Sequence, residues 1–259
     1  MHPTTATPTA PTRASLRNEV LIVLGVSIGA SAIWAALRIV ERLTREEALA
    51  AQTAALNVSR TPDRPWLDLV WQLTGISLAV VPVFLALYLL NRHPGQGVRL
   101  IGLDLRQPRF DLFGGAGLAM LIGIPGLGLY LAAYQWGMSV QIAPANLAAV
   151  WWAVPVLMLA ALQNALLEEV VGLGYLMTRL RELGWGVAAA VGAHALLRGS
   201  YHLYQGFGGF IGNAIMGVIF ALFYLRFKRV MPLVVAHTLL DVGAFVGYAL
   251  FRDQISWLP

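Results

Sequence analysis

Apolar residues along this chain gather in long blocks that polar residues rarely interrupt. A helix needs about 20 mostly apolar residues to cross a bilayer. The fourth block is long enough for a tilted helix or for a helix broken at Pro155, and the fifth is rich in Gly and Ala. We predict an all-α, polytopic transmembrane helical bundle with about seven spans, at residues 20–38, 69–90, 112–134, 148–178, 185–203, 207–225 and 232–251.

The segments outside these blocks complete the predicted organisation. Glu41 and Arg45 are spaced i,i+4, which predicts a hydrated helix continuing out of the first span. Gly208 and Gly212 form a small-xxx-small pattern, which indicates close packing of helices more than a phosphate-binding loop. The predicted divisions are a disordered tail at 1–15, N-terminal transmembrane helices at 16–145 with a loop at 38–68, a C-terminal helical core at 146–251 and a tail at 252–259.

Composition supports a membrane protein. The chain is 58% hydrophobic and 12% charged, whereas soluble domains average about 25% charged residues. Its net charge of +5 comes from arginine almost alone, and in a membrane protein such an excess indicates cytoplasmic loops and anionic lipid, not nucleic acid. The absence of cysteine from the sequence excludes disulfides, iron–sulfur clusters and a catalytic thiol.

Arginine also predicts the topology, because positively charged loops stay in the cytoplasm. The basic loops 91–111, 179–184 and 226–231 are therefore predicted to be cytoplasmic, which places the N-terminus inside. The segment 38–68 conflicts with this rule, since it carries five arginines on the predicted outer side. The expected location is a bacterial plasma membrane, with the chain crossing it several times.

The last four spans differ from the first three because they carry ionisable residues in their interiors. A charge at the bilayer centre costs about 2.5–3.5 kcal/mol, so these groups are expected to face one another around water or a metal. Three pairs are spaced i,i+4 and share a helix face: Asn164 with Glu168, Arg198 with His202, and His237 with Asp241. The unpaired groups are Glu169 and His194, the latter read mainly as a packing residue.

Depth along the helices gives a check on this cluster. Glu169 lies ten residues before Arg179, and His237 lies eight residues after Arg229, which places both about 12–15 Å from the same side at 1.5 Å per residue. His202 counts to about 30 Å along a straight helix. It reaches the cluster only if the fifth span starts within the membrane or tilts strongly.

Three ordered motifs carry a family resemblance: "EEVVGLGYL" (Glu168–Leu176), "RGSYH" (Arg198–His202) and "HTLLD" (His237–Asp241). Over about residues 150–250 they resemble the CPBP family, which comprises CAAX prenyl protease 2 and bacteriocin-processing enzymes and is also called Abi. That family's pattern is Glu-Glu-xxx-Arg, then Phe-xxx-His, then His-xxx-Asn or His-xxx-Asp. The resemblance makes residues 146–251 a CPBP-like catalytic helical core.

The resemblance implies an intramembrane endopeptidase that hydrolyses a peptide bond with a glutamate-activated water. Glu168 would be the general base, helped by His202, and His237 would bind the developing oxyanion with support from Asp241. The implied partners are a membrane-associated protein or peptide substrate and the lipid bilayer, without nucleic acid. The implied catalytic residues are Glu168, Glu169, His202, His237 and Asp241, with Arg198 and Asn164 supporting them.

Two positions depart from the family pattern. Leu173 stands where the family has Arg, and Arg198 stands where it has the Phe of Phe-xxx-His. We hypothesise that the cation has moved to another helix, so that Arg198 takes over the contact with Glu169. A structural salt bridge between the Glu pair and Arg198 is the alternative explanation of these charges.

A metal and two other functions stay open. Glu168, His202 and His237 are a plausible zinc set, but they lie on three helices without a local ligand motif, so no cofactor is favoured and zinc is the alternative. A non-enzymatic membrane immunity or scaffold protein would keep the cluster for binding a partner. A proton-coupled transporter would use the same groups as a relay, since Glu and His chains carry protons through membranes.

Overall fold

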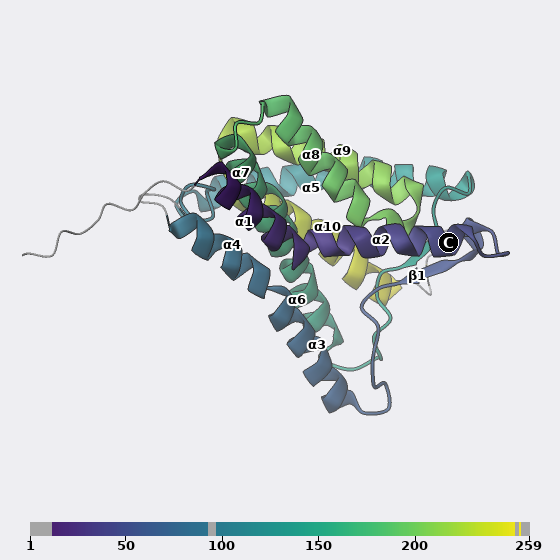
Figure 1. Cartoon of the computed structure of the whole chain (residues 1–259). Coiled ribbons are helices and arrows are strands. Elements are labelled where there is room, and N and C mark those ends of the chain that lie inside the picture. The colour runs from purple at the N-terminus through teal and green to yellow at the C-terminus, as the bar shows by residue number, and fades with distance from the viewer. Residues whose placement is uncertain (1–11, 93–96, 252–253, 255–259) are drawn as a thin grey trace, which may run out of the picture.

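The computed structural model describes residues 12–92, 97–251 and 254, which form a bundle of helices with two very short strands (Figure 1). The helices are α1 (Arg13–Gly25), α2 (Ile28–Leu43), α3 (Pro65–Ala79), α4 (Val81–Asn91), α5 (Pro108–Gln135), α6 (Ala153–Leu166), α7 (Leu176–Glu182), α8 (Val187–Tyr201), α9 (Phe207–Phe227) and α10 (Met231–Phe251). The shorter elements are η1 (Leu49–Ala51), β1 (Thr53–Ala55), β2 (Gln141–Ala143), the π-helical η2 (Leu167–Tyr175) and η3 (Leu203–Gln205). The predicted all-α class is confirmed.

The described residues contain fewer candidate spans than the seven predicted. Among the described residues, five helices are long and apolar enough to cross a membrane, and the bent pair α1–α2 makes a sixth if it counts as one span. The predicted fifth span corresponds to α8, which has only 15 residues and is about 22 Å long against a hydrocarbon core of about 30 Å. The chain is an integral membrane protein, and α8 is shorter than the hydrocarbon core.

The first predicted span, 20–38, is bent instead of straight. α1 and α2 meet at 53°, and Ser27 leaves the helical conformation between them with φ −143° and ψ −129°. The Ser27 hydroxyl donates to the carbonyl of Val23. Such a bond from a serine side chain to the carbonyl four residues earlier often bends a helix. The bend turns α2 across α8 and η3, the elements that it contacts.

The predicted ends of the chain differ in part. The tail predicted at 1–15 lies outside the described residues up to residue 11, but α1 begins at Arg13, where the Thr12 hydroxyl accepts from the Ser15 N–H at 3.2 Å. This N-cap stabilises the helix start, so the tail prediction is wrong for residues 13–15. Of the tail predicted at 252–259, only residue 254 is described.

The predicted hydrated helix beyond the first span is confirmed in part, since α2 continues past residue 38, but among the described residues no further α-helix forms before α3. α2 ends at Leu43, although Arg45 and Glu41 do form the expected ion pair. β1 then pairs in parallel with β2, with Ala54 opposite Ile142. Local sequence patterns do not predict this three-residue strand. The strand is stabilised by pairing with a segment almost ninety residues away.

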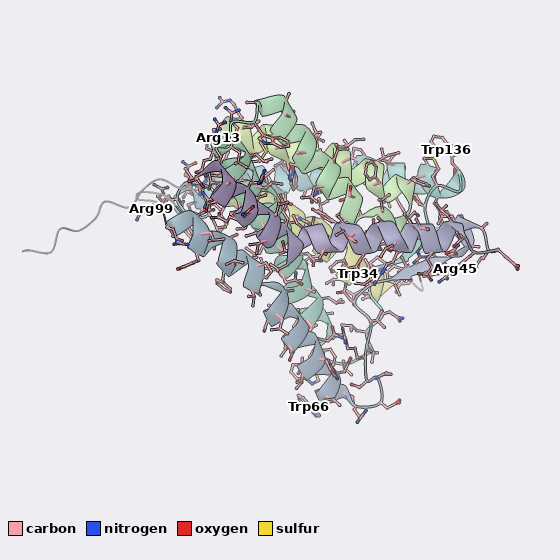
Figure 2. All side chains as sticks on the ribbon, in the orientation of Figure 1. Arg13, Trp34, Arg45, Trp66, Arg99 and Trp136 are labelled. Atoms are coloured by element: carbon pink, nitrogen blue, oxygen red, sulfur yellow. The ribbon has the colours of Figure 1, made fainter. Side chains whose placement is uncertain are left out.

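Charged residues tie several helix ends together at one end of the bundle. Arg179 donates to Glu19 at 2.7 Å and to Glu182 at 2.8 Å, which joins α7 to α1. Arg229 joins the α9–α10 turn to Asp104 at 3.0 Å and to Asp111 at 2.7 Å. Figure 2 shows Arg13 and Arg99 at this end and Arg45 and Trp136 at the opposite end. The described parts of the loops predicted to be cytoplasmic therefore share one side, as the topology requires.

The rod formed by α6, η2 and α7 lies at the centre of the bundle. It is the most enclosed of the five candidate spans, and Val170, Val171, Leu173 and Tyr175 of η2 are fully buried. No break occurs at Pro155, because this residue lies in the first turn of α6, where proline is tolerated. α8 and α10 pack against this rod, so polar groups on the three elements are enclosed together.

The turn between α8 and α9 depends on one glycine. Gly206 has φ +96°, and a Cβ there would lie 2.5 Å from the carbonyl oxygen of Met138. Only glycine fits such a conformation and such a close approach. The predicted packing role of Gly208 is also supported, since a Cβ at this position would meet the Cβ of Ala133 on α5 at 2.5 Å.

Candidate functional site

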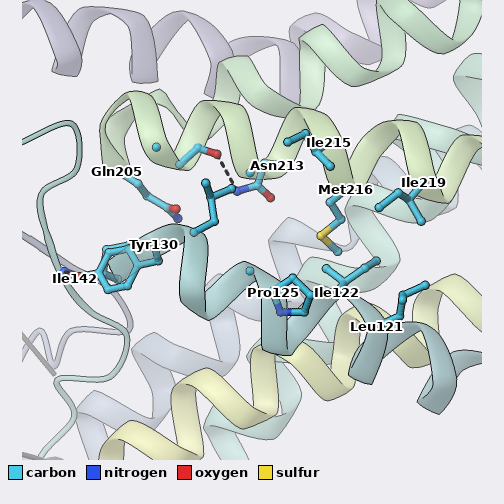
Figure 3. A pocket seen from close by; sticks show the side chains of 15 residues that line it. Leu121, Ile122, Pro125, Tyr130, Ile142, Gln205, Asn213, Ile215, Met216 and Ile219 are labelled. Carbon is cyan, nitrogen blue, oxygen red and sulfur yellow. Dashed lines mark hydrogen bonds between the residues drawn. The ribbon is translucent and has the colours of Figure 1, made fainter. Parts of the chain in front are cut away.

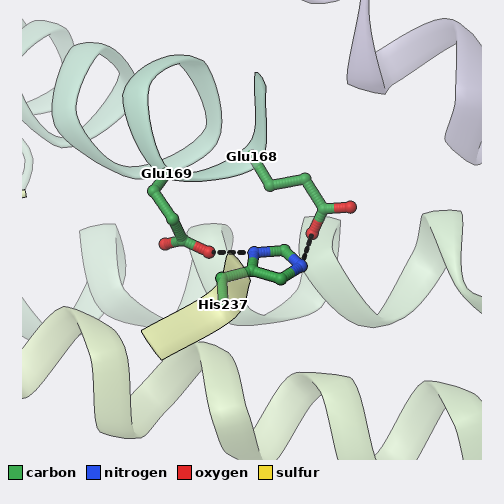
Figure 4. Close-up of side chains that lie close together, drawn as sticks. All are labelled: Glu168, Glu169 and His237. Atoms are coloured by element: carbon green, nitrogen blue, oxygen red, sulfur yellow. Dashed lines mark hydrogen bonds and ion pairs between the residues drawn. The ribbon is translucent and has the colours of Figure 1, made fainter. Parts of the chain in front are cut away.

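The candidate site begins with the two carboxylates of η2. A helix closed by i→i+5 hydrogen bonds has more residues per turn than an α-helix, so successive side chains are separated by less than the α-helical angle of about 100°. Glu168 and Glu169 stand at the start of this segment. Both of them reach the His237 ring of α10 (Figure 4), which consecutive residues of an ordinary α-helix would do less readily.

Glu169 is completely buried and held by two donors. Its Oε1 accepts from Arg198 Nη1 at 2.7 Å and lies 2.8 Å from His237 Nδ1. Arg198 is 1% exposed and Glu169 is 0% exposed. The structure therefore contains the hypothesised contact between Arg198 of α8 and the Glu pair. A buried charge is tolerated only when paired and hydrogen-bonded, and Arg198 supplies the pairing here.

Glu168 differs from Glu169 in exposure and partners. Its side chain is 13% exposed, and its Oε2 accepts from the Tyr201 hydroxyl at 2.9 Å and lies 3.4 Å from Arg198 Nη2. Among the described residues, no hydrogen bond is formed to its second oxygen. Tyr201 was missed by the sequence analysis, although its position three residues after Arg198 places it on the same side of α8.

His237 connects both carboxylates to Asp241. An ionised carboxylate cannot donate, so we assign the hydrogen on Nδ1 to the bond with Glu169. Nε2 then faces Glu168 Oε2 at 3.9 Å and Asp241 Oδ1 at 3.7 Å. Asp241 also accepts from Asn164 Nδ2 at 3.1 Å. Asn164 shares a helix face with Glu168 in the sequence, and in the structure its amide donates to Asp241.

His194 of α8 and His202, the residue that follows α8, have backbone partners, unlike His237. The Nδ1 of His202 lies 2.9 Å from the carbonyl oxygen of Arg198, and its ring centre lies 4.8 Å from that of Tyr201. The Nδ1 of His194 lies 2.7 Å from the carbonyl oxygen of Gly172. His194 is buried and bonds to backbone, which agrees with its interpretation as a packing residue.

The carboxylate cluster also bears on the question of a zinc ion. Glu168, His202 and His237 are the ligands expected from the sequence, but the group brought together consists of Glu168, Glu169 and His237, whose ligand atoms lie within 4.8 Å of one another. The guanidinium of Arg198 lies against both carboxylates, at 2.7 and 3.4 Å. A divalent cation bound to the same oxygens would be repelled by this fixed positive charge.

A cavity lies beside this cluster. Figure 3 shows it between α5 and α9, with a volume of about 430 Å³. The Met216 side chain lines the cavity, and its sulfur lies 3.6 Å from Arg198 Nη2. Its wall is mostly apolar, with Tyr130, Gln205 and Asn213 as the large polar residues. The ion-paired cluster is therefore separated from a space in the bundle by one flexible side chain.

Fold and site together define a class: an integral membrane protein whose central helices enclose two carboxylates, an arginine and a histidine. Residues 150–243 match the family described as Rce1-like, type II CAAX prenyl endopeptidase. The matched segment covers α6 to α9 and half of α10, and it includes every catalytic residue suggested by the sequence. It confirms the resemblance to the CPBP family. Searches of curated proteins and of solved structures found no match.

Proposed function

We propose that this protein is an intramembrane endopeptidase that hydrolyses a peptide bond with a water activated by Glu168. The observation that carries the proposal is that two adjacent carboxylates differ in burial and in hydrogen-bond partners. Glu169 is sealed and shares one oxygen between two donors, whereas Glu168 is partly exposed and uses one oxygen for Tyr201. The family match supports an endopeptidase of the CAAX protease type in general terms.

Glu168 is the better general base of the two. A base must reach a water molecule and the substrate within hydrogen-bond distance, and the burial of Glu169 prevents this. The Tyr201 hydroxyl holds the Glu168 carboxylate in place through Oε2, which leaves the other oxygen to take the proton of the attacking water. Glu168 then returns this proton to the nitrogen of the leaving amine as the carbon–nitrogen bond breaks.

In this proposal His237 stabilises the negative charge that develops on the substrate carbonyl oxygen. Nδ1 is directed at Glu169 and Nε2 lies between Glu168 and Asp241, and the proposed mechanism uses the ring in its protonated form. The Nε2–H then donates to the oxyanion that develops on the substrate carbonyl, an interaction worth several kcal/mol in such sites. Asp241 positions the ring, and Asn164 holds Asp241.

His202 and Arg198 have supporting roles in this proposal. The His202 Nδ1 is directed to a backbone carbonyl, so its Nε2 is an acceptor in the neutral ring and can orient the attacking water. Arg198 fixes the relative positions of Glu168 and Glu169 through one planar guanidinium. Because Arg198 already places a positive charge against both carboxylates, the proposed mechanism uses no metal.

The substrate in this proposal is a membrane-associated protein or peptide, and the membrane is a bacterial plasma membrane. The carboxylates lie in the interior of a candidate span, so the scissile bond must enter the bilayer region. The cavity that ends at Met216 gives a polypeptide room to approach from between α5 and α9. The N-terminus is proposed to be cytoplasmic, since Arg13 lies at the same end as Arg99 (Figure 2).

The test is Glu168→Gln, compared with the wild-type protein in a host that lacks the gene, by mapping new peptide termini in the membrane proteome. Cleavage should fall at least about 10²-fold, the usual contribution of a general base. Thermal stability in detergent should stay within a few degrees, because the amide keeps the Tyr201 contact.

Glu41→Gln is the matched control, since Glu41 is an exposed carboxylate at the end of α2 and its loss should change no cleavage. Wild-type cleavage by Glu168→Gln would contradict the proposed function. A collapse of thermal stability in that variant would instead favour the structural salt bridge as the reason for the Glu pair.

A further inference from the structure

A second cavity, which has a polar lining, adjoins the carboxylate cluster on the side where α2 crosses α8. Its volume is about 270 Å³. α2 contributes residues spaced i, i+3, i+4 and i+7, which form one helix face. The face opposite is formed by the end of α8 and by η3. The lining residues are Ser31, Trp34, Ala35, Arg38, Tyr201 and Tyr204.

Every polar group that lines this cavity can donate a hydrogen bond, and the described lining includes no carboxylate. Arg38 is exposed, and within the described residues it forms no hydrogen bond or ion pair. The Tyr204 hydroxyl accepts from Gln205 Nε2 at 2.9 Å, so its own hydrogen is free to donate. Trp34 can only donate. A ligand that satisfies these groups must bring acceptor oxygens and a negative charge.

Arg38 also stands apart from the arginines that follow it. Arg42 donates to the carbonyl of Thr53 at 3.2 Å, and Arg45 pairs with Glu41. These contacts give Arg42 and Arg45 a structural role. Both belong to segment 38–68, where the predicted topology leads us to expect few arginines. Arg38 has no such contact, and it faces a cavity.

One residue joins this cavity to the proposed base. Tyr201 lines the cavity and donates its hydroxyl hydrogen to Glu168 Oε2 at 2.9 Å. A group bound by Arg38 and Tyr204 would therefore lie one side chain away from the carboxylate that activates water.

We infer that Arg38, with Tyr204 and Trp34, binds an oxyanion, either a carboxylate of the peptide substrate or the phosphate of a lipid, beside the catalytic cluster. Only the link between this site and hydrolysis rests on the proposed function; the binding of an oxyanion does not. Arginine suits both ligands, because its planar fork matches carboxylate and phosphate oxygens in a bidentate manner. A peptide carboxylate bound here would fix which bond reaches Glu168.

The experiment measures binding, so it does not depend on hydrolysis. The Glu168→Gln protein is placed in nanodiscs of phosphatidylcholine, and the affinities of acetyl-Leu-Phe and of its C-terminal amide are compared by calorimetry. The acid should bind about tenfold more tightly than the amide, as charge-assisted pairing predicts. This preference should disappear in Arg38→Ala and be partly retained in Arg38→Lys. Arg45→Ala, which removes one charge from the same end of the protein, should keep it.

A separate experiment tests lipid phosphate as the ligand. Phosphatidylglycerol replaces part of the phosphatidylcholine, and the shift in melting temperature is measured for the same variants. A shift that is lost in Arg38→Ala and kept in Arg45→Ala supports the oxyanion site with lipid phosphate as its ligand. The inference is overturned if neither the peptide preference nor the lipid shift depends on Arg38, or if Arg45→Ala loses as much as Arg38→Ala. Failure of the proposed function would show separately, as unchanged proteolysis in Glu168→Gln.

Discussion

Arg198 and Glu169 are joined at 2.7 Å from two different elements, α8 and η2. In the family pattern the arginine follows the Glu pair on the same helix, at the position of Leu173 in this chain. Leu173 is fully buried here, and its apolar side chain lies in the main hydrophobic cluster. The counter-charge of the Glu pair is therefore supplied by tertiary packing.

The first prediction concerns this exchange of positions. Arg198→Phe should abolish activity and destabilise the protein by about 3–5 kcal/mol, because it leaves a buried carboxylate without its partner. Adding Leu173→Arg should restore part of both, since it returns the cation to the position where the family has it. Proteolysis and thermal melting in detergent measure the two effects.

Leu173→Arg alone is the necessary control, because it adds a second cation to the cluster and should impair stability. If the double variant is as inactive and as unstable as Arg198→Phe, the cation has not simply moved between helices, and the hypothesis is wrong.

Asp241→Asn should be impaired mildly, by about threefold to tenfold in kcat, without loss of folding. The amide can still contact Asn164, but it no longer stabilises a protonated His237 at 3.7 Å. The separate values of kcat and KM distinguish this role from a structural one, since a misplaced ring should lower kcat and leave KM unchanged. A complete loss of activity in a well-folded protein would mean that Asp241 takes part in the chemistry directly.

Metal removal should leave activity unchanged. The guanidinium of Arg198 lies between the carboxylates that a zinc ion would need, so the cluster already contains its cation. Purified protein should retain its activity after dialysis against 1,10-phenanthroline, and elemental analysis should find much less than one zinc per chain. Inactivation by the chelator that is reversed by zinc, but not by magnesium, would refute the metal-free mechanism.

Asp104 should contribute to stability in a pH-dependent manner. Hydrogen bonds from Arg106, then from Arg229, hold the pKa of Asp104 well below its usual value, against the opposing effect of burial. A lowered pKa in the folded state means that the stabilisation is complete above the unfolded pKa of about 3.9 and is lost as the pH falls through the folded value. Asp104→Asn should therefore destabilise the protein by about 1–2 kcal/mol at pH 7, and the difference should narrow below about pH 4.

Circular dichroism melts between pH 7 and pH 3 measure this dependence. Asp63→Asn, which changes an exposed carboxylate in the loop before α3, is the matched control and should leave the stability unchanged at every pH. A constant difference between wild type and Asp104→Asn down to pH 3 would show that the contact contributes by packing and not by charge.

Part of the site could be predicted because the bilayer makes polar residues conspicuous. The depths estimated for Glu169 and His237 agreed, and the two side chains do meet at 2.8 Å. Helix periodicity also placed His237 and Asp241 on one face, where they lie 3.7 Å apart. These predictions succeeded because they needed only the helical rise, the helical period and the cost of a buried charge.

Other features could not be predicted because they depend on neighbours in space. The π-helical geometry of η2 is decided by packing among buried side chains. Tyr201 looked like one aromatic among many in an apolar chain, and only its distance to Glu168 distinguishes it. Asn164 shares a spacing with Glu168 but finds its partner on α10. The pairing of β1 with β2 joins segments that carry no common pattern.

The placement of Arg198 has a consequence for biosynthesis. The ribosome completes residues 153–182 before it makes α8, so both glutamates reach the translocon before their counter-charge exists. An arginine at position 173 would have neutralised the pair within one helix, but Leu173 does not. Since each unpaired charge costs about 2.5–3.5 kcal/mol in the bilayer, this segment must enter lipid with its carboxyls protonated or wait beside the translocon until α8 emerges. The order of synthesis thus makes insertion of the catalytic helix depend on a residue translated after it.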